Sequence, residues 1–361
     1  MAVKNKSNNM LSILLICIAT FIILFIIGSM LIVKNVYDVN FQRNDKPDPK
    51  FAGYISYSDV EQYKRTEVEF ESGKNTLKGY IYGEDNVNDN DKGLVVIVHG
   101  LGEGAESYLS ETLYFADNGW RVFAFDCTGS YESEGESTVG LPQSAIDLAA
   151  TLEYIKSNNT LNELPIMLYG HSWGGYAVTA ILNYNYDIKA VASISGFNSP
   201  KELLLEQTKD MMGIIGYIVS PFDIYQNLLF GEKAKVSAVD GINGKDTAVM
   251  IIHGVNDDAI AYNGASIISH KDEITNPNVI YKTYSNENHN GHNDLYLSDA
   301  AIKYINEKNA EYKELFDNYN GKIPDDIRAE YYAGVDKFQT SELDVNFMNE
   351  INLFFENHIK N

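Results

Sequence analysis

The sequence has very little cysteine, with only Cys17 and Cys127 among 361 residues. Cys17 lies inside an apolar N-terminal run, so an internal disulfide between the two is implausible, and no zinc-type cysteine spacing exists. A fold held together by disulfides or zinc is therefore not expected. The 45% of residues that are hydrophobic are enough for one sizeable core or two modest ones.

Basic residues are also scarce. The chain has 28 lysines and arginines against 50 aspartates and glutamates, which gives a formal net charge of −22. Such a surface repels phosphate backbones. We therefore expect no nucleic acid among the partners of this protein. Internal repeats and low-complexity tracts are absent from the sequence as well.

One long hydrophobic run stands near the N-terminus, where Met10 to Val33 gives 24 residues without a charged side chain. At ~1.5 Å per residue a helix of this length crosses a hydrocarbon layer of ~30 Å. The run is too long for a signal peptide, and residues 28–30 make a poor cleavage site. We predict a tail at residues 1–9 and an uncleaved membrane anchor at residues 10–33. A cleaved signal and a buried core helix are the alternatives.

Charged residues flank both ends of this run. Lys4 and Lys6 favour an N-terminus inside the cell, whereas Lys34 and Arg43 on the other flank oppose that orientation. Long C-terminal domains translocate largely regardless of flanking charge. We therefore expect the globular domain to lie outside the cytoplasm.

The rest of the chain divides into a linker and one globular domain. Residues 34–60 are polar, with clustered aspartates and prolines, and are typical of a stalk. Residues 61–361 begin with two alternating segments around a Ser-Gly-Lys-Asn turn, which predicts an antiparallel hairpin. Short runs that are apolar on both faces follow, separated by helical stretches, and predict an α/β fold with a mostly parallel, buried sheet. These runs are Leu94–Val98, Val122–Phe125, Ile166–Tyr169, Ala190–Ile194, Val249–Ile252 and Val279–Tyr284.

Two stretches interrupt this alternation. Residues 198–245 carry the apolar groups Leu203–Leu205 and Met211–Ile215 and predict a helical cap. Residues 295–340 form a polar, tyrosine-rich insert. The helices expected elsewhere are Leu141–Ser157, Gly174–Tyr184 and Val345–His358.

The strongest functional signal is a G-x-S-x-G motif centred on Ser172. It follows an apolar strand and precedes a helix, which is the context of a serine exposed on a strained strand-to-helix turn. Side chains larger than hydrogen at positions 170 and 174 would collide with the strand and the helix. We predict Ser172 as a catalytic nucleophile. The alternative is a glycine-rich turn with no catalytic duty.

A second glycine-flanked turn, residues 99–103, follows the strand Leu94–Val98. In proteins with such a nucleophile turn, one oxyanion donor is the amide of the residue after the nucleophile, here Trp173. The other comes from the loop after an earlier strand, and here we predict Leu101. The alternative is a plain turn at the end of a strand.

The acid of a catalytic triad should follow a later strand. Asp257 stands three residues after Gly254, behind the run Val249–Ile252, and is the predicted acid. Asp258 is the alternative, unless it is only a turn residue. The role of the acid is to fix the tautomer of the base and to stabilise its protonated form.

The base is reached by elimination, because chain order in such triads is Ser, Asp, His. His270 and His358 fall in expected helices, which leaves the loop after the last strand. His289, five residues after that strand, is the predicted base, and His292 is the alternative. A third interpretation takes His289, His292 and Asp294 as metal ligands, although no further convincing ligand is evident.

These motifs resemble those of the α/β-hydrolases in the monoglyceride lipase, lysophospholipase and serine aminopeptidase-like group. Residues 99–103 match the HGxGE motif of that group, and residues 170–175 match its GHSxGG motif. Residues 126–135 keep most of its D-x-x-G-x-G-x-S-x-G loop, but Tyr131 replaces the middle glycine. The similarity covers about residues 65–292 and the last helix. It implies the α/β-hydrolase fold, with helices on both faces of the sheet.

The predicted function is hydrolysis of carboxylic esters through Ser172, His289 and Asp257, with no metal or organic cofactor. The expected substrate is a small ester or lipid-like molecule, with the apolar residues of the cap lining its acyl pocket. A serine peptidase or amidase is the alternative enzyme. A membrane-anchored binding protein that has lost turnover is the alternative outside enzymes. The oligomeric state stays open.

Overall fold

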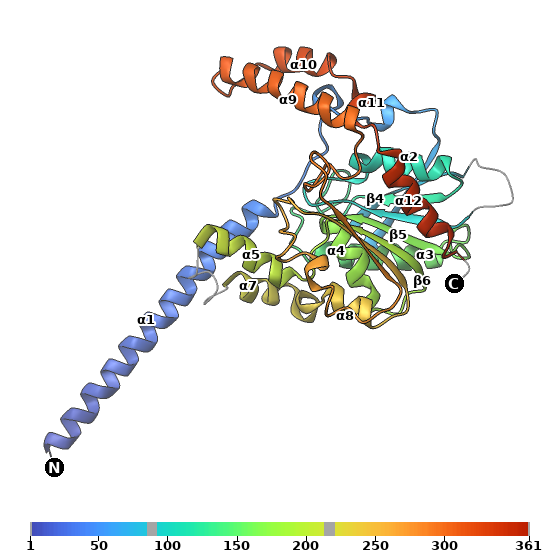
Figure 1. Cartoon of the computed structure of the whole chain (residues 1–361). Helices are drawn as coiled ribbons and strands as arrows, with labels where there is room; N and C mark the ends of the chain where they lie inside the picture. The colour runs from blue at the N-terminus through green and yellow to red at the C-terminus, as the bar shows by residue number, and fades with distance from the viewer. Residues whose placement is uncertain (1, 85–91, 213–220, 360–361) are drawn as a thin grey trace.

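The computed structural model describes residues 2–84, 92–212 and 221–359. An eight-stranded sheet lies at its centre, in the order β1-β2-β4-β3-β5-β6-β7-β8 (Figure 1). β1 pairs antiparallel with β2 and β2 with β4, and every other neighbouring pair is parallel. The strands are β1 (Arg65–Ser72), β2 (Asn75–Tyr82), β3 (Leu94–Val98), β4 (Arg121–Phe125), β5 (Ile166–His171), β6 (Ile188–Ile194), β7 (Ala248–Gly254) and β8 (Val279–Tyr284). The predicted hairpin and all six predicted apolar strands are present, which confirms the expected fold class.

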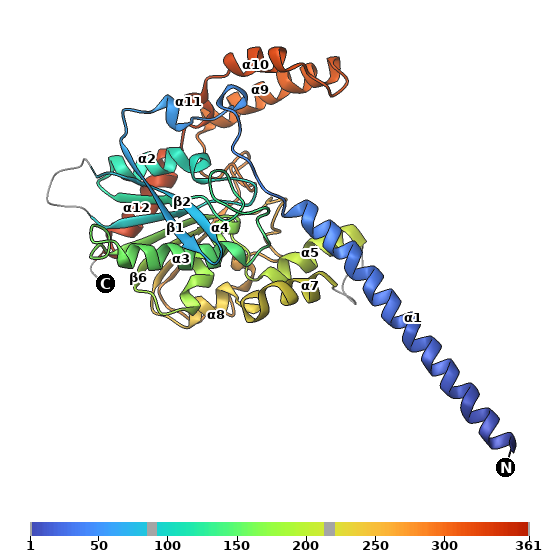
Figure 2. The ribbon, with the colours of Figure 1, turned by 180° about the vertical axis from the view of Figure 1, so that it is seen from behind.

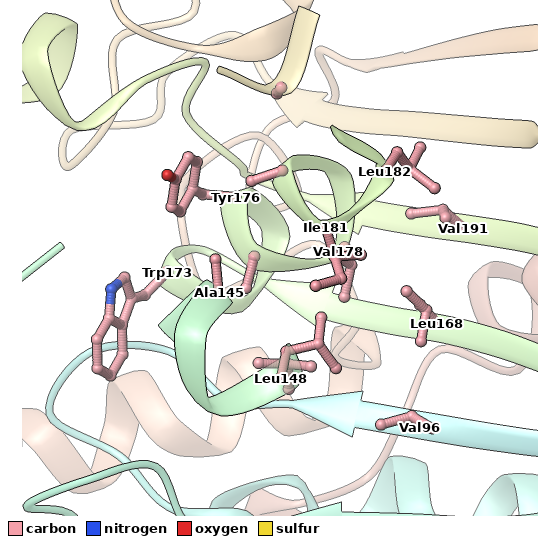
Figure 3. Packing of buried hydrophobic residues seen from close by; sticks show 14 of the residues in the cluster. Val96, Ala145, Leu148, Leu168, Trp173, Tyr176, Val178, Ile181, Leu182 and Val191 are labelled. Carbon is pink, nitrogen blue, oxygen red and sulfur yellow. The ribbon is translucent and has the colours of Figure 1, made fainter. Parts of the chain in front are cut away.

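Both faces of this sheet are buried. Leu94, Val96 and Val98 of β3 belong to one hydrophobic cluster, whereas Val95 and Ile97 belong to the other. This alternation follows from the two-residue period of a strand, and explains why the central strands are apolar throughout. Figure 3 shows one of these faces, where the residues of α3 and α4 pack on β3, β5 and β6.

The helices form layers on the two faces. The face in Figure 3 is covered by α3 (Gln143–Ser157), α4 (Trp173–Ala180) and α8 (Ala238–Asn243), and the opposite face by α2 (Leu109–Asp117) and α12 (Val345–Glu356). Because these strands are parallel, their carboxyl ends lie at the same edge of the sheet, where ligands of such folds bind. Short 3-10 helices occupy Pro49–Phe51, Tyr57–Asp59, Ala105–Tyr108, Ile181–Asn183, Gly231–Lys235 and Ile267–His270.

The N-terminal helix α1 (Ala2–Asn40) extends far out of this body (Figures 1 and 2). Its segment Ser12–Asn40 is long and apolar enough to serve as a membrane anchor or a signal sequence, and it is almost entirely unburied. The expectation of a polar stalk at residues 34–60 is not met. The helix continues through Asn40, and the residues after it pack on the domain.

This packing comes from apolar side chains spaced between the polar ones of residues 34–60. Tyr37, Phe41 and Val60 are buried, and Ala52 and Ile55 are buried with them. The guanidinium of Arg43 donates to the carbonyl oxygens of residues 131, 133 and 135. Residues 34–60 are polar on average, but the apolar side chains among them are buried against the domain.

The two predicted excursions are both helical. The cap region, residues 198–245, contains α5 (Pro200–Met212), α7 (Pro221–Phe230) and α8. Residues 213–220 lie outside the described part of the chain, so the expected roles of Ile214 and Ile215 fall there. The insert at residues 295–340 forms α9 (Asp299–Asn318), α10 (Asp325–Ala333) and α11 (Lys337–Thr340), on the side of the body away from the free end of α1 (Figure 1).

A buried carboxylate joins three parts of the domain below the sheet edge. Asp147 of α3 is fully buried. It accepts hydrogen bonds from Ser72 Oγ at 2.6 Å, from the backbone N–H of Thr128 at 2.8 Å and from Gln143 Nε2 at 2.9 Å. It thereby ties the β1–β2 turn and the loop after β4 to α3.

We expect Asp147→Ala to lower the free energy of unfolding by roughly 2–4 kcal/mol, because several buried donors lose their acceptor at once. Thermal unfolding of the detergent-solubilised protein measures this. The control is Asp187→Ala, whose carboxylate pairs with Lys189 at 3.1 Å on the surface and is 83% exposed, and which should change stability by less than about 0.5 kcal/mol. Equal losses in the two variants would contradict the role given to Asp147.

Candidate active site

Ser172 lies on the turn between β5 and α4. Its backbone has φ 57° and ψ −113°, a left-handed conformation that few non-glycine residues adopt. A Cβ at Gly170 would overlap the carbonyl oxygen of Gly174, and a Cβ at Gly174 would overlap the carbonyl oxygen of Val98. Both glycines of the motif are therefore required by close approach of the backbone, as predicted. The turn points the serine toward the carboxyl ends of the strands.

A continuous chain of hydrogen bonds joins Ser172 to His292 and Asp257. His292 Nε2 lies 2.9 Å from Ser172 Oγ, and His292 Nδ1 lies 2.8 Å from Asp257 Oδ2. Because a carboxylate accepts only, Nδ1 carries the proton and Nε2 is left to accept the serine hydroxyl proton. The side chains come from three separate loops, which follow β5, β7 and β8.

Asp257 is held in its ionised form by the groups around it. Its Oδ1 accepts from the backbone N–H groups of Ala259 at 3.0 Å and Ile260 at 2.8 Å. Burial alone would raise the pKa of Asp257, but the hydrogen bonds from His253 and His292 outweigh it and hold that pKa well below its usual range. Asp258, the alternative acid, has an exposed side chain.

The structure corrects the predicted base. The side chain of His289 contacts Asp299 and not Ser172, with its Nε2 2.9 Å from Asp299 Oδ1. Asp299 begins α9, in the insert that had no assigned structure in the sequence. His292, the alternative, takes the position beside Ser172 instead. No local sequence signal separates the two histidines, since both follow an asparagine or glycine in the same loop.

Leu101 and Trp173 both line the cavity that holds Ser172 and His292. Trp173 is the first residue of α4, where the amide N–H groups have no acceptor within the helix. Leu101 lies in the turn after β3. The buried His99 fixes this turn, since its Nε2 accepts from the amide of Cys127 at 2.9 Å and its Nδ1 donates to the carbonyl of Gly100 at 2.7 Å.

A buried polar network holds the main chain of His292. The sequence analysis did not predict it. The carbonyl oxygen of His292 lies 2.9 Å from His171 Nε2. On the other side of that ring, His171 Nδ1 lies 2.7 Å from the hydroxyl of Tyr108. The same hydroxyl contacts Glu103 Oε2 and accepts from the amide of Gly100 at 3.1 Å.

The ring of His171 is neutral in this network. A carbonyl only accepts, so His171 Nε2 carries a proton, and burial lowers the pKa of His171 to about 3. The Tyr108 hydroxyl joins this ring to Glu103, because it contacts both His171 Nδ1 and Glu103 Oε2. Burial raises the pKa of Glu103.

The loop after β4 shows how the chain accommodates Tyr131 in place of the glycine of related motifs. Tyr131 adopts φ 41°, the left-handed conformation in which glycine is usual. Its hydroxyl lies 2.8 Å from Ser107 Oγ and 3.1 Å from the hydroxyl of Tyr54. A Cβ at Gly104 would overlap the Tyr131 ring. The absence of a side chain at 104 therefore makes room for the one at 131.

Ser172 opens into a cavity of about 430 Å³. Its walls come from the turn after β3, the cap and, unexpectedly, the end of α1. Most of the lining is apolar, and Glu103 is the carboxyl-bearing residue among its described members. The apolar residues of this lining are Val36, Tyr37, Phe41, Leu101, Leu141, Trp173, Phe197, Leu203, Leu204, Phe222, Ala259 and Ile260.

The alternative of a metal site at His289, His292 and Asp294 finds no support in the arrangement of these side chains. His289 contacts Asp299, whereas His292 contacts Ser172 and Asp257. Asp294 accepts from the amide of Gly291. Over the ranges that the structure describes, no group of three or more His, Cys, Asp or Glu side chains is placed to hold a metal ion.

Comparisons with known proteins agree with this architecture. Residues 89–230 match a family model described as serine aminopeptidase, S33. No curated protein matches the chain at a significant level. Among solved structures, an esterase of Pyrococcus furiosus aligns at 17% identity and a TM-score of 0.52, over 76% of this chain and 95% of its own.

Two further structures align over much of the domain. Est1E from Butyrivibrio proteoclasticus, with ferulic acid bound, aligns at 18% identity over 68% of this chain and 97% of its own, with a TM-score of 0.50. An acylaminoacyl peptidase of Pyrococcus horikoshii aligns at 17% identity over 72% of this chain and 43% of its own, with a TM-score of 0.51. The chain therefore has the α/β-hydrolase fold and resembles the serine aminopeptidase-like group of that superfamily.

Proposed function

We propose that this protein is a membrane-anchored serine hydrolase that cleaves carboxylic esters. Ser172 is the nucleophile, His292 the base and Asp257 the acid of the triad. The observation that carries the proposal is the unbroken hydrogen-bond chain through these three side chains, at 2.9 Å and 2.8 Å, on a strained strand-to-helix turn. The proposed mechanism uses neither a metal nor an organic cofactor.

In the proposed reaction, Ser172 Oγ attacks the ester carbonyl carbon while His292 Nε2 takes its proton. The charge that develops on the carbonyl oxygen is stabilised by the amides of Leu101 and Trp173. His292 then gives the proton to the leaving alcohol, and an acyl-serine remains. Water, deprotonated by His292, attacks this acyl group and releases the carboxylic acid and free Ser172.

Asp257 and the buried network keep His292 in place for both steps. The ionised Asp257 fixes the tautomer in which Nδ1 carries the proton, and it stabilises the imidazolium that forms transiently. His171 holds the main chain of the same residue through the carbonyl oxygen at 2.9 Å. The neutral ring of His171 orients His292 without adding a positive charge that would oppose its protonation.

An ester is favoured over an aminoacyl substrate by the lining of the cavity. A peptidase that recognises a substrate amine needs a free carboxylate near the reacting bond. Glu103 is the carboxyl-bearing residue among the described members of the lining, and its Oε2 is engaged by the Tyr108 hydroxyl. The mostly apolar lining instead suits an acyl chain.

In this proposal, α1 anchors the enzyme in a membrane and determines on which side the hydrolase domain lies. Its uncharged run is long enough to cross a bilayer, and Lys4 and Lys6 precede that run. We place the N-terminus inside the cell and the hydrolase domain outside the cytoplasm.

Replacement of Ser172 tests the proposed chemistry directly. The wild type should react with a fluorophosphonate probe and hydrolyse acyl esters in preference to aminoacyl arylamides. Ser172→Ala should lose the label and at least about 10⁴-fold in kcat, because no other group can form the acyl intermediate. An unlabelled wild type would refute the serine hydrolase proposal, and faster cleavage of the arylamides would make it a peptidase.

Separate replacement of the two loop histidines tests the base. His292→Ala should lower kcat/KM by at least about 10³-fold, because the proton of Ser172 then has no acceptor. His289→Ala loses only a surface pair with Asp299 and should change kcat/KM by less than about fivefold. Steady-state kinetics on one ester compares the two variants. Full activity in His292→Ala would overturn the assignment.

Two substitutions of Glu103 test the support that it gives to Tyr108. Glu103→Gln keeps a polar partner for the Tyr108 hydroxyl and should stay within about threefold of the wild type in kcat/KM, whereas Glu103→Ala should lose about 10–100-fold, as supporting groups around catalytic residues commonly do. The measurement is the pH profile of kcat/KM in both variants. Wild-type activity in Glu103→Ala would contradict this supporting role.

A further inference from the structure

The last turns of α1 are docked on the catalytic domain. Val33, Tyr37 and Phe41 are all buried, at a spacing of four residues that places them on one face of the helix. The hydroxyl of Tyr37 donates to Gln226 Oε1 at 3.3 Å, and its ring centroid lies 5.2 Å from that of Tyr225. α1 is therefore attached along a side-chain interface with α7 of the cap.

This docked end is also a wall of the cavity at Ser172. Val36, Tyr37, Asn40 and Phe41 line it together with residues of the cap. The fit is close, because a Cβ at Gly140 would overlap the Tyr37 hydroxyl. The helix that would anchor the protein thus takes part in forming the space that receives the substrate.

The height of the cap above a membrane follows from the length of the uncharged run. Met10–Val33 spans about 36 Å at ~1.5 Å per residue, against a hydrocarbon thickness of ~30 Å. Tyr37, which contacts α7, lies one turn beyond Val33, or about 6 Å further along the axis. When α1 spans the bilayer, α7 therefore lies at the level of the headgroups.

α7 presents apolar side chains to solvent at this level. Ile224 and Leu228 are 51% and 73% exposed, at positions i and i+4 of one helix face, and Leu229 is also exposed. Figures 1 and 2 show α5 and α7 beside the proximal part of α1, on the side of the body toward which α1 extends. Apolar side chains on a helix at the interface enter the boundary between headgroups and acyl chains.

We propose that the end of α1 and the cap form an entrance from the bilayer to Ser172. The substrate is an acyl ester dissolved in the membrane, whose chain enters the cavity along the end of α1 and the cap residues that line it. Tyr37 forms the wall of the cavity on the α1 side and limits its width there. Ile224, Leu228 and Leu229 insert into the membrane interface and hold the entrance against it. The inference rests on the proposed function and adds to it the physical source of the substrate.

The first test separates membrane-borne from dissolved substrate. The full chain is reconstituted in phosphatidylcholine vesicles that contain a fluorogenic long-chain acyl ester, and p-nitrophenyl butyrate serves as the soluble ester. Leu228→Asp should lower the rate on the vesicle ester by about tenfold or more, which corresponds to the lost burial of one leucine. Its rate on the soluble ester should change by less than about twofold.

The matched control is Leu353→Asp, on α12 at the far side of the body, where the side chain is 56% exposed. This variant should leave both rates unchanged. No loss on the vesicle ester in Leu228→Asp, or an equal loss on both esters, would overturn the proposal. If Leu228→Asp changed the oligomeric state but not the rate on the vesicle ester, the proposal would also be overturned. The exposed side chains of α7 would then form an interface between two copies of the chain.

The second test concerns the wall itself and uses soluble esters of graded chain length. Tyr37→Ala should change the ratio of long-chain to short-chain kcat/KM by about tenfold, the usual effect of a small change in an apolar pocket. Tyr37→Phe keeps the ring and should preserve that ratio. If the ratio were unchanged in Tyr37→Ala, α1 would not contact the acyl chain of the substrate, and the proposal would be overturned.

Failure of the proposed function would look different from failure of this inference. A wild type that is not labelled at Ser172 and cleaves neither ester refutes the hydrolase. A wild type that is labelled and cleaves the soluble ester, with variants that behave like it on vesicles, leaves the hydrolase standing and refutes only the entrance.

Discussion

The close approach of α4 to β3 is the contact on which the site depends. Gly174 lies against the carbonyl of Val98 with no room for a side chain, and Gly170 allows the turn before it to close. This contact sets the start of α4 beside the turn that carries Leu101. It therefore places the turn after β3 and the start of α4 beside Ser172, while His292 and Asp257 come from the loops after β8 and β7. A larger residue at either glycine would displace all of these groups together.

Much of the fold could be predicted because both faces of the sheet are buried. A strand covered on two sides must be apolar at every position, so β3 was located to the residue and the other central strands to within a few residues. The edge strand β8 is only partly buried, yet its predicted bounds also match. Asp257 was also found, because its distance from the preceding glycine is set by one tight turn. Of the helices that cover the sheet, α3, α4 and α12 match predicted helices, whereas α2 was not predicted.

The parts that the sequence did not predict depend on contacts with distant segments. His289 and His292 have similar neighbours in the sequence, and only the folded chain pairs His289 with Asp299 of the insert and His292 with Ser172. The docking of residues 34–41 likewise depends on the cap, over 180 residues later in the case of Gln226. The polar network behind His292 joins the end of β5 to the segment after β3 and the loop after β8, and no spacing in the sequence predicts it. Such features need the folded chain to be seen.

The fit between Tyr131 and Gly104 bears on how this chain could have diverged from its relatives. The ring at 131 occupies the place where a side chain at 104 would stand. A side chain at 104 and the tyrosine ring at 131 therefore exclude each other, so the two positions constitute an epistatic pair. Glycine at 131 would give up the contacts of the hydroxyl with Ser107 and Tyr54.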